Sequence, residues 1–517
     1  MEGPSEEEPD TREEPEEPEE PEAPGRGSPR FTVKGLLIGL AAAFVVGVAA
    51  VLMVRNVQAL GVEVGGTCTG RRRDALGSCP RGSTWMMVVS LGGLLVGVPA
   101  AFIALLVTLR TRFALPLLAV AVAAGVLPGD RIFDGVHGPT LETAWTVRGD
   151  SQTPAHGVWR HGSTVIRALP ERLVAHDLAT GDRRWTYDLP ASQRLCAMSA
   201  DTVGGLGVVG VAAQGSACSR FAIVDLAKGE AREVALPGRP PDASVTTLQD
   251  VPSGVTADMV AVAGGVLVVG TRSALYGYRL RDGRGLWRRP AAPECRFGGV
   301  RGGGDRVLVE VGCGVASYRV RAVDATTGLP RWETPVPDQG PTMGLTLLSA
   351  SPAVVHVRRD RPGVDTGAIA TFDDAGRIRA TIPVDDGRRR LRTHDVAFDA
   401  APDRALKVDG DRLVVQALTD GRRHGNVQVY GLGDGRLRWS TRLDDVLAVR
   451  PEPGRVLVVA GGLRAPRLHA LATADGAKSY LGVTTFLRWP AQGILLAQGD
   501  GYVVLTRGSP FAAARFA

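Results

Sequence analysis

The sequence predicts an all-β propeller of seven or eight four-stranded blades, with eight preferred, preceded by three transmembrane α-helices and a disordered acidic tail. Three observations support this prediction. A strand–turn–strand motif ending in glycine recurs at intervals of about 49 residues along residues 140–517. Three apolar runs lie within residues 31–133, and residues 1–30 are acidic and rich in proline. We therefore divide the chain at residues 30 and 140.

Charge is distributed unevenly along the chain. Of the 517 residues, the first 25 hold eleven Glu, one Asp and one Arg, a net −11, so the remaining 492 carry +17 of the overall +6. The basic residues are scattered and mostly arginine, which is typical of a GC-rich coding genome. Scattered charge does not form the basic patch of a nucleic-acid-binding protein, so we expect no nucleic-acid partner.

Residues 1–30 are expected to form a disordered tail. Repulsion among glutamates and the six prolines of the first 25 residues oppose both helix and sheet, and no apolar periodicity offers a core face. Attraction of a basic partner to this tail stays open as a second interpretation.

The apolar runs predict membrane spans at about 35–54, 85–109 and 113–127, joined by a loop at 55–84. The third run is the shortest and contains Pro116. It spans only if residues 128–133 lie in the interface, and a re-entrant segment is the alternative. A cleaved signal peptide is not expected, because the residues before the first run are long and acidic rather than short and basic.

Cysteine placement predicts the topology, because basic residues flank the spans almost equally on both sides. With three spans, all six cysteines lie on one side, in loop 55–84 and in the region after residue 130. Their even number and local spacing favour disulfides in an oxidising compartment over buried thiols. The predicted pairs are Cys68–Cys79, Cys196–Cys218 and Cys295–Cys313. We expect a multi-pass protein of the cell (plasma) membrane, with a cytoplasmic N-terminus and an extracytoplasmic propeller and loop.

The recurring motif supplies the candidate structural residues. Glycine closes a turn that requires positive φ, and the predicted turn glycines are Gly181, Gly229, Gly283, Gly328, Gly376, Gly435 and Gly476. Four residues later an aromatic ring is placed to pack against the neighbouring blade, at Trp185, Trp287, Trp332, Trp439 and Tyr480. Two units depart, with Glu233 and Ala380 at this place. Aspartates in these turns are expected to accept backbone N–H bonds.

The segments AVDATTGLPRW (322–332) and AHDLATGDRRW (175–185) resemble the PQQ-type propeller repeat. The resemblance covers about 375 residues and is most specific in these two units. It implies a propeller shared by quinoprotein dehydrogenases and by non-enzymatic envelope proteins such as the lipoprotein of the outer-membrane assembly machine. The segment Thr143–Arg148, with Trp145, is expected to complete the last blade and close the ring.

The sequence predicts no catalytic, cofactor-binding or metal site. The adjacent Cys–Cys pair that the resemblance leads one to look for in a quinone enzyme does not occur, and the histidines lack ligand spacing. We therefore expect a membrane-anchored, extracytoplasmic, non-catalytic binding or scaffold module for an envelope protein, peptide or polymer. Two alternatives stay open: a quinone-dependent oxidoreductase, and a ligand-sensing ectodomain that signals across the membrane.

Overall fold

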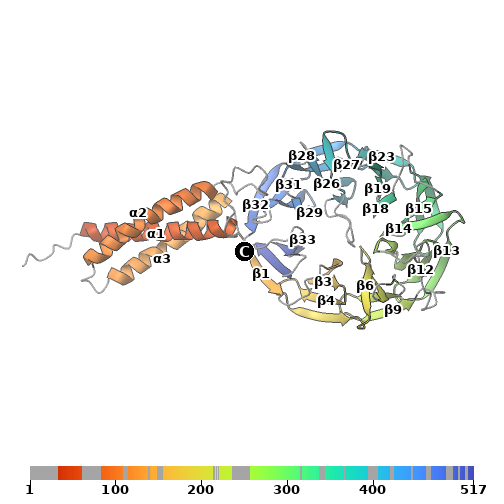
Figure 1. Ribbon diagram of the computed structural model, residues 1–517, viewed down its shortest axis with the longest axis horizontal. Helices are drawn as coiled ribbons and strands as arrows, with labels where there is room; N and C mark the ends of the chain where they lie inside the picture. Colours follow the sequence, from red (N-terminus) through yellow and green to blue (C-terminus); the bar gives the residue numbers. More distant parts are fainter. Residues whose placement is uncertain are drawn as a thin grey trace, which may run out of the picture.

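Three long helices precede a ring of β-sheets in the computed structural model (Figure 1). The structure describes residues 33–60, 83–108 and 114–137, and residues 140–516 apart from gaps, the longest of which are 148–154, 236–256, 337–343, 394–405 and 485–492. The predicted tail and the Cys68–Cys79 pair lie outside the described residues. The helices are α1 (Val33–Leu60), α2 (Ser83–Thr108) and α3 (Ala114–His137).

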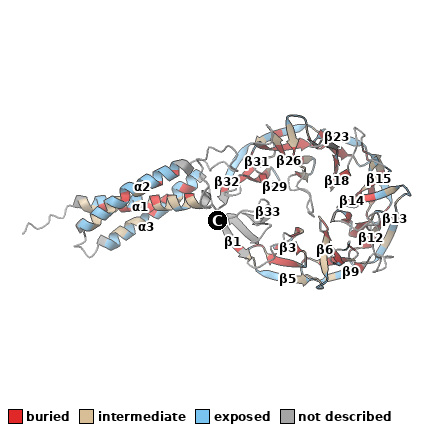
Figure 2. Ribbon diagram, in the orientation of Figure 1, coloured by how far each residue is buried: buried red, intermediate tan, exposed pale blue. Residues whose placement is uncertain are grey.

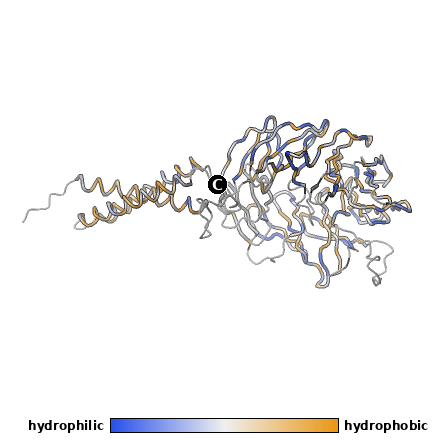
Figure 3. The backbone as a smooth tube through the Cα atoms, turned by 45° about the horizontal axis from the view of Figure 1, so that its top comes forward, coloured by the Kyte–Doolittle hydropathy of each residue, from blue (hydrophilic) through white to orange (hydrophobic). Residues whose placement is uncertain are grey.

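All three helices are long and apolar enough to cross a membrane, over Gly35–Val57, Trp85–Leu106 and Leu115–Val136. They are hydrophobic along most of their length, whereas hydropathy changes sign repeatedly in the ring (Figure 3). Helix α3 runs ten residues beyond the predicted end at residue 127, through Pro128. The added turns are held because Phe133 is buried against Leu52 and Met86 of the other two helices.

Glycines let the helices approach closely, which favours association in lipid. A side chain at Gly125 of α3 would overlap Phe44 O of α1, and one at Gly47 of α1 would overlap Val122 O of α3. Helix α1 therefore contacts α3 backbone to backbone. Beyond these contacts, Arg55 Nε and Asp130 Oδ1 form an ion pair at 3.0 Å between the same two helices.

The remaining strands form seven sheets of four or more strands, arranged in a ring (Figure 1). Sheet 1 has β2 (Gly157–His161), β3 (Thr164–Leu169), β4 (Arg172–Asp177) and β5 (Arg183–Asp188), and sheet 2 has β6 (Gln193–Met198), β7 (Leu206–Ala213), β8 (Arg220–Asp225) and β9 (Ala231–Ala235). Sheet 3 has β10 (Val260–Ala263), β11 (Val266–Gly270), β12 (Ala274–Arg279) and β13 (Gly285–Pro290), and sheet 4 has β14 (Cys295–Gly303), β15 (Arg306–Cys313), β16 (Ser317–Asp324) and β17 (Pro330–Pro335).

Sheet 5 has β18 (Gly344–Ala350), β19 (Ala353–Arg358), β22 (Ala368–Phe372) and β23 (Ile378–Pro383), with the small hairpin β20 (Asp360–Arg361) and β21 (Val364–Asp365) beside it. Sheet 6 has β24 (Arg389–Leu391), β25 (Leu406–Asp409), β26 (Arg412–Thr419), β27 (His424–Gly431) and β28 (Leu437–Arg442). Sheet 7 has β29 (Val446–Glu452), β30 (Arg455–Ala460), β31 (Arg467–Ala472), β32 (Lys478–Thr484), β1 (Thr140–Val147), β35 (Phe511–Phe516), β34 (Gly501–Thr506) and β33 (Gly493–Gln498).

The prediction of seven or eight blades is confirmed for seven sheets of four or more strands, rather than for the preferred eight. Sheet 7 has eight strands, since its halves β29–β32 and β33–β35 with β1 are joined through β1. Strand β1 pairs in parallel with the end of β32 at Thr140↔Val483, and antiparallel with β35. The predicted closure of the ring by an N-terminal strand holding Trp145 is confirmed.

Apolar packing between neighbouring sheets holds the ring together. All six residues of β3 and all five of β11 are buried, so middle strands are covered on both faces. One cluster joins Phe221 and Val208 of sheet 2 to Leu267 of sheet 3, and others join further neighbouring pairs. Figure 2 shows buried residues inside the ring and exposed ones on outer strands such as β5 and β13. The core therefore lies between sheets.

Gly125→Val tests the close approach of α1 and α3. The added side chain must push the two backbones apart, so we expect the detergent-solubilised protein to lose helix packing and to melt at a lower temperature. Gly92→Val is the matched control, because a side chain at Gly92 meets nothing within 4 Å. Equal melting of both variants would show that the contact does not stabilise the bundle.

Candidate functional site

The seven predicted turn glycines lie between the third and fourth strands of their sheets. All have φ between 67° and 81°, a range that favours glycine. In the first unit Gly181 N donates to Asp177 O at 2.8 Å. The Asp177 carboxylate accepts from the backbone N–H groups of Ala179 and Thr180, so it acts as a turn former.

Arginines of the outer strands pair with these turn aspartates. Arg331 Nη2 donates to Asp324 Oδ2 at 2.7 Å and to Asp305 Oδ2 at 2.6 Å. The hydrogen bond from Arg331 holds the pKa of Asp324 below its ordinary value. The stability from this pair is therefore present above the unfolded Asp pKa and is lost as the pH falls through the lower folded pKa.

Each tryptophan of the motif packs on the turn glycine of the following sheet. The Trp185 ring of sheet 1 lies against Gly229 of sheet 2, and a Cβ there would come within 2.6 Å of the ring. Three further contacts have the same form, namely Trp287 on Gly328, Trp332 on Gly376 and Trp439 on Gly476. We call each such contact a clasp.

A hydrogen bond accompanies most clasps. The indole N–H donates to the carbonyl three residues before the contacted glycine: Trp185 to Leu226 at 3.3 Å, Trp287 to Ala325 at 3.0 Å and Trp439 to Thr473 at 2.9 Å. Trp332 Nε1 has no partner among the described residues. The turn that it contacts is one residue shorter, with Gly376 N donating to Asp373 O, so the usual acceptor is already used within the turn.

Trp145 forms a clasp that the sequence motif does not include. Its ring lies against Gly181, and its Nε1 donates to Leu178 O at 3.0 Å. Strand β1 thus provides sheet 7 with the aromatic that contacts sheet 1. The signal in the sequence was weak, because no turn glycine precedes Trp145.

The two units without an aromatic residue at this position are packed differently. Ala380 lies 3.3 Å from the position a Cβ would take on Gly435, and the buried Thr371 hydroxyl donates to Leu432 O at 2.7 Å, the carbonyl that a tryptophan would use. At the other junction, Val234 packs on Gly283, and Glu233 points away to pair with Arg220 at 3.3 Å. Tyr480, in the last predicted aromatic position, tilts against His469 at 5.6 Å between ring centroids.

Two of the three predicted disulfides lie within the described residues, and both are confirmed. Cys196 of β6 is bonded to Cys218, and Cys295 of β14 to Cys313 of β15. They close loops with sequence separations of 22 and 18 residues. Loops of this size contribute on the order of 3 kcal/mol each in the chain-entropy account.

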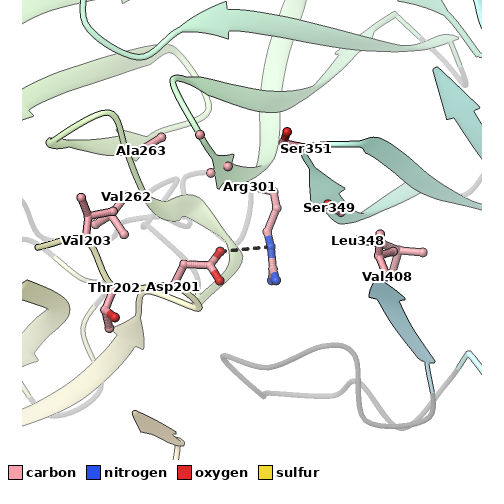
Figure 4. Close-up of a pocket in the computed structure, with 13 residues that line it drawn as sticks. Asp201, Thr202, Val203, Val262, Ala263, Arg301, Leu348, Ser349, Ser351 and Val408 are labelled. Carbon is pink, nitrogen blue, oxygen red and sulfur yellow. Dashed lines mark ion pairs between the residues drawn. The ribbon is translucent and has the colours of Figure 1, made fainter. Parts of the chain in front are cut away.

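The candidate binding site is a polar cavity of about 400 Å³ at the centre of the ring (Figure 4). Inner strands and their loops from five consecutive sheets line it. The lining residues are Asp201, Thr202, Val203, Val262, Ala263, Arg301, Gly302, Gly303, Gly304, Leu348, Ser349, Ser351 and Val408. No sequence motif marks this site, because its residues come from five repeats that share no pattern at these positions.

Glycines hold β14, the strand that bears Arg301, between its neighbours. A Cβ at Gly302 would overlap Val262 O of β10, and a Cβ at Gly303 would come within 3.0 Å of Ser351 N beyond β18. Gly302 and Gly303 therefore permit close packing of inner strands. This positions Arg301, the preceding residue, at the cavity.

Arg301 is the dominant charge of the cavity. Its side chain is 14% exposed, and its Nε lies 3.7 Å from Asp201 Oδ2 of the β6–β7 loop, two sheets away. Figure 4 shows the guanidinium extending into the opening between the labelled side chains. Serine and threonine hydroxyls and short apolar side chains complete the wall. The arrangement can bind an anionic group.

Glu310 and His469 are buried titratable groups that lie outside the cavity lining. Glu310 accepts the Gly299 and Leu345 N–H groups at 3.2 and 3.1 Å, and burial raises its pKa. Burial lowers the pKa of His469 to about 4, helped by the charges of Lys478 and Arg467. Within the described ranges no group of three His, Cys, Asp or Glu side chains is placed to hold a metal ion.

Glu233→Trp tests whether a missing clasp can be added. Val234 already packs on Gly283 and Glu233 points away from it, so the indole would lie outside the junction. Only a surface ion pair worth little would be lost, and we expect no gain in melting temperature over the unchanged protein. Glu233→Ala controls for loss of the ion pair and should leave melting unchanged.

Ala380→Trp is the opposite case. Ala380 is buried, Gly435 already packs against it and Thr371 uses the acceptor. Overpacking should therefore destabilise the protein by about 1–3 kcal/mol. A rise in melting temperature for either Glu233→Trp or Ala380→Trp would contradict the clasp description.

The similarity of this chain to known proteins lies in the ring of sheets. The family model PQQ_2, described as outer membrane protein assembly factor BamB, matches residues 239–397, which include sheets 3 to 5. No curated protein sequence matches the chain.

Solved structures with a related arrangement have low identity. BamB from Moraxella catarrhalis is 14% identical, with 73% of this chain and 100% of that chain covered and a TM-score of 0.44. The quinohemoprotein alcohol dehydrogenase ADHIIG from Pseudomonas putida HK5 is 12% identical, with coverages of 72% and 75% and a TM-score of 0.45. The family match and the sheet arrangement confirm that this chain carries a PQQ-type β-propeller repeat.

Proposed function

We propose that this protein is a membrane-anchored, extracytoplasmic propeller that binds or scaffolds an envelope protein, peptide or polymer without catalysing a reaction. One observation carries the proposal: α3 ends at His137, and β1, the strand that closes the ring, begins at Thr140. Two intervening residues span roughly 10 Å at most. The ring is therefore tied to an apolar helix of span length.

The disulfides support the orientation. Disulfides persist in oxidising compartments and are rare in the cytosol, and both described bonds lie in the ring. With three spans, a ring outside the cytoplasm leaves the N-terminal tail inside. The Glu-rich residues 1–25 and most of the arginines of the remainder would then lie on opposite sides of the membrane.

The composition of the cavity supports binding rather than catalysis. Its lining holds hydroxyls of Thr202, Ser349 and Ser351 beside one Arg–Asp pair. A hydroxyl nucleophile requires a positioned base to activate it. Neither a histidine nor a lysine lines the cavity within the described residues, and the one carboxylate, Asp201, faces Arg301 at 3.7 Å. A polar site open to solvent through loops suits recognition.

Topology can be tested by labelling intact spheroplasts with a membrane-impermeant maleimide. We expect Cys295 and Cys313 to be labelled only after an impermeant reductant has broken their bond, because both are then outside. Ser5→Cys is the internal control, and it should be labelled only after permeabilisation. Labelling of Ser5→Cys in intact spheroplasts would overturn the orientation.

Partner binding can be tested by replacing Val203 or Val408, which line the cavity, with a photo-crosslinking amino acid in native membranes. We expect discrete adducts from both positions, identified by mass spectrometry, because a ligand at the cavity lies within reach of both. The same amino acid at Arg183, exposed on β5, is the control. Adducts of equal yield and identity at Arg183, or none from the cavity, would contradict the proposal.

A further inference from the structure

Arg301 has hydrogen-bond donors that the described protein does not use. Its guanidinium offers five N–H groups, and no hydrogen bond from it is found within the described residues; the only charged partner is Asp201 at 3.7 Å. Arg306, three residues after the cavity glycine Gly303 and of similar exposure at 11%, donates to Ala350 O and to Asp374 Oδ1, both at 2.7 Å. No Arg301 nitrogen is a buried atom without a partner among the described residues, so these donors are accessible from the cavity and available to a ligand.

We infer that the cavity binds a carboxylate of an acidic peptide segment, with Arg301 as its receptor and Asp201 as an internal competitor. The inference rests on the proposed function and specifies the chemical class of the ligand. A carboxylate presents two oxygens in the geometry that a guanidinium fork accepts. Arg301 extends into the opening rather than along the wall (Figure 4), so its terminal nitrogens face an incoming group.

Asp201 distinguishes a carboxylate from a phosphate. Its side chain is 51% exposed and lies near Arg301 at a distance too long for a hydrogen bond. A carboxylate bound to Arg301 would interact with the same guanidinium as Asp201. A doubly charged phosphate would feel both the attraction to Arg301 and the repulsion from Asp201 twice over, but its second charge would find no second cation in the cavity lining and would cost more to desolvate. The local charge therefore favours a single-charge anion.

The rest of the lining suits a peptide around the carboxylate. Val262, Leu348 and Val408 offer apolar wall, while Thr202, Ser349 and Ser351 offer hydroxyls to amide groups. The volume of about 400 Å³ lies at the low end of small-ligand sites. It accommodates one acidic side chain or chain terminus with its neighbours rather than a folded domain.

Titration calorimetry of the full chain in nanodiscs tests the inference. The probes are the tetrapeptide acetyl-Ala-Val-Ala-Glu-amide, its Gln counterpart, acetyl-Ala-Val-Ala-Ala with a free terminal carboxylate, and inorganic phosphate. We expect the two carboxylate peptides, or one of them, to bind at least about tenfold more tightly than the Gln peptide and phosphate. The pair of carboxylate peptides tells an acidic side chain from a chain terminus.

Variants with opposite expected effects separate recognition from folding. Arg301→Gln should weaken carboxylate binding about tenfold or more, and Arg301→Lys should restore part of it. Asp201→Asn should tighten binding several-fold, because the competing charge is removed, a gain that loss of structure cannot produce. Arg412→Gln is the control, since Arg412 pairs with Asp411 outside the cavity lining and should leave binding unchanged.

Equal affinity for the Glu and Gln peptides, tighter binding of phosphate, no binding of any probe, or an unchanged affinity in Asp201→Asn would each overturn the inference. Crosslinking from Val203 and Val408 in membranes is independent of these probes. Adducts there together with no carboxylate binding would leave the binding module in place and reject only the ligand class.

Discussion

Each clasp requires a glycine with positive φ and no side chain, and most of the ring depends on this constraint. The turn of one sheet must be bare where the tryptophan of the preceding sheet lies on it, as Gly229 is beneath Trp185. The indole N–H then satisfies a turn carbonyl that would otherwise be covered. The glycine of each turn therefore fixes where the preceding sheet packs. The same contact recurs along the ring and holds neighbouring sheets at a similar spacing.

Glycines also allow close packing of backbones at the centre of the ring. Gly302 and Gly303 bring β14 against β10 and the end of β18, where larger residues would force the inner strands apart. Close packing of inner strands narrows the centre to a cavity. It also fixes the backbone beside Arg301, so that a charged side chain with unused donors stands in the opening. The recognition chemistry therefore follows from the packing of the scaffold.

The same strand, β1, closes the ring and joins it to the helices. Strand β1 supplies both the edge pairing of β35 and the aromatic for the clasp on Gly181. It also follows α3 after two residues. A force transmitted by the helices would therefore act on the strand that seals the propeller. The pairing of β1 with β32 further merges the last two groups of four strands into one sheet.

The sequence by itself determined the apolar helices, the repeat, the turn glycines and two disulfides, because each depends on residues close together in the chain. Turn geometry needs Gly at one place, and cross-strand cysteines 18 residues apart in adjacent strands meet whatever surrounds them. Only the tertiary structure decided the number of sheets, since one parallel contact between residues 140 and 483 merges two groups. It also decided how Thr371 substitutes for a missing indole, and it alone assembled the cavity. Arg301 in β14 and Asp201 in the β6–β7 loop are 100 positions apart, and the arrangement of the ring rather than local spacing brings their charges together.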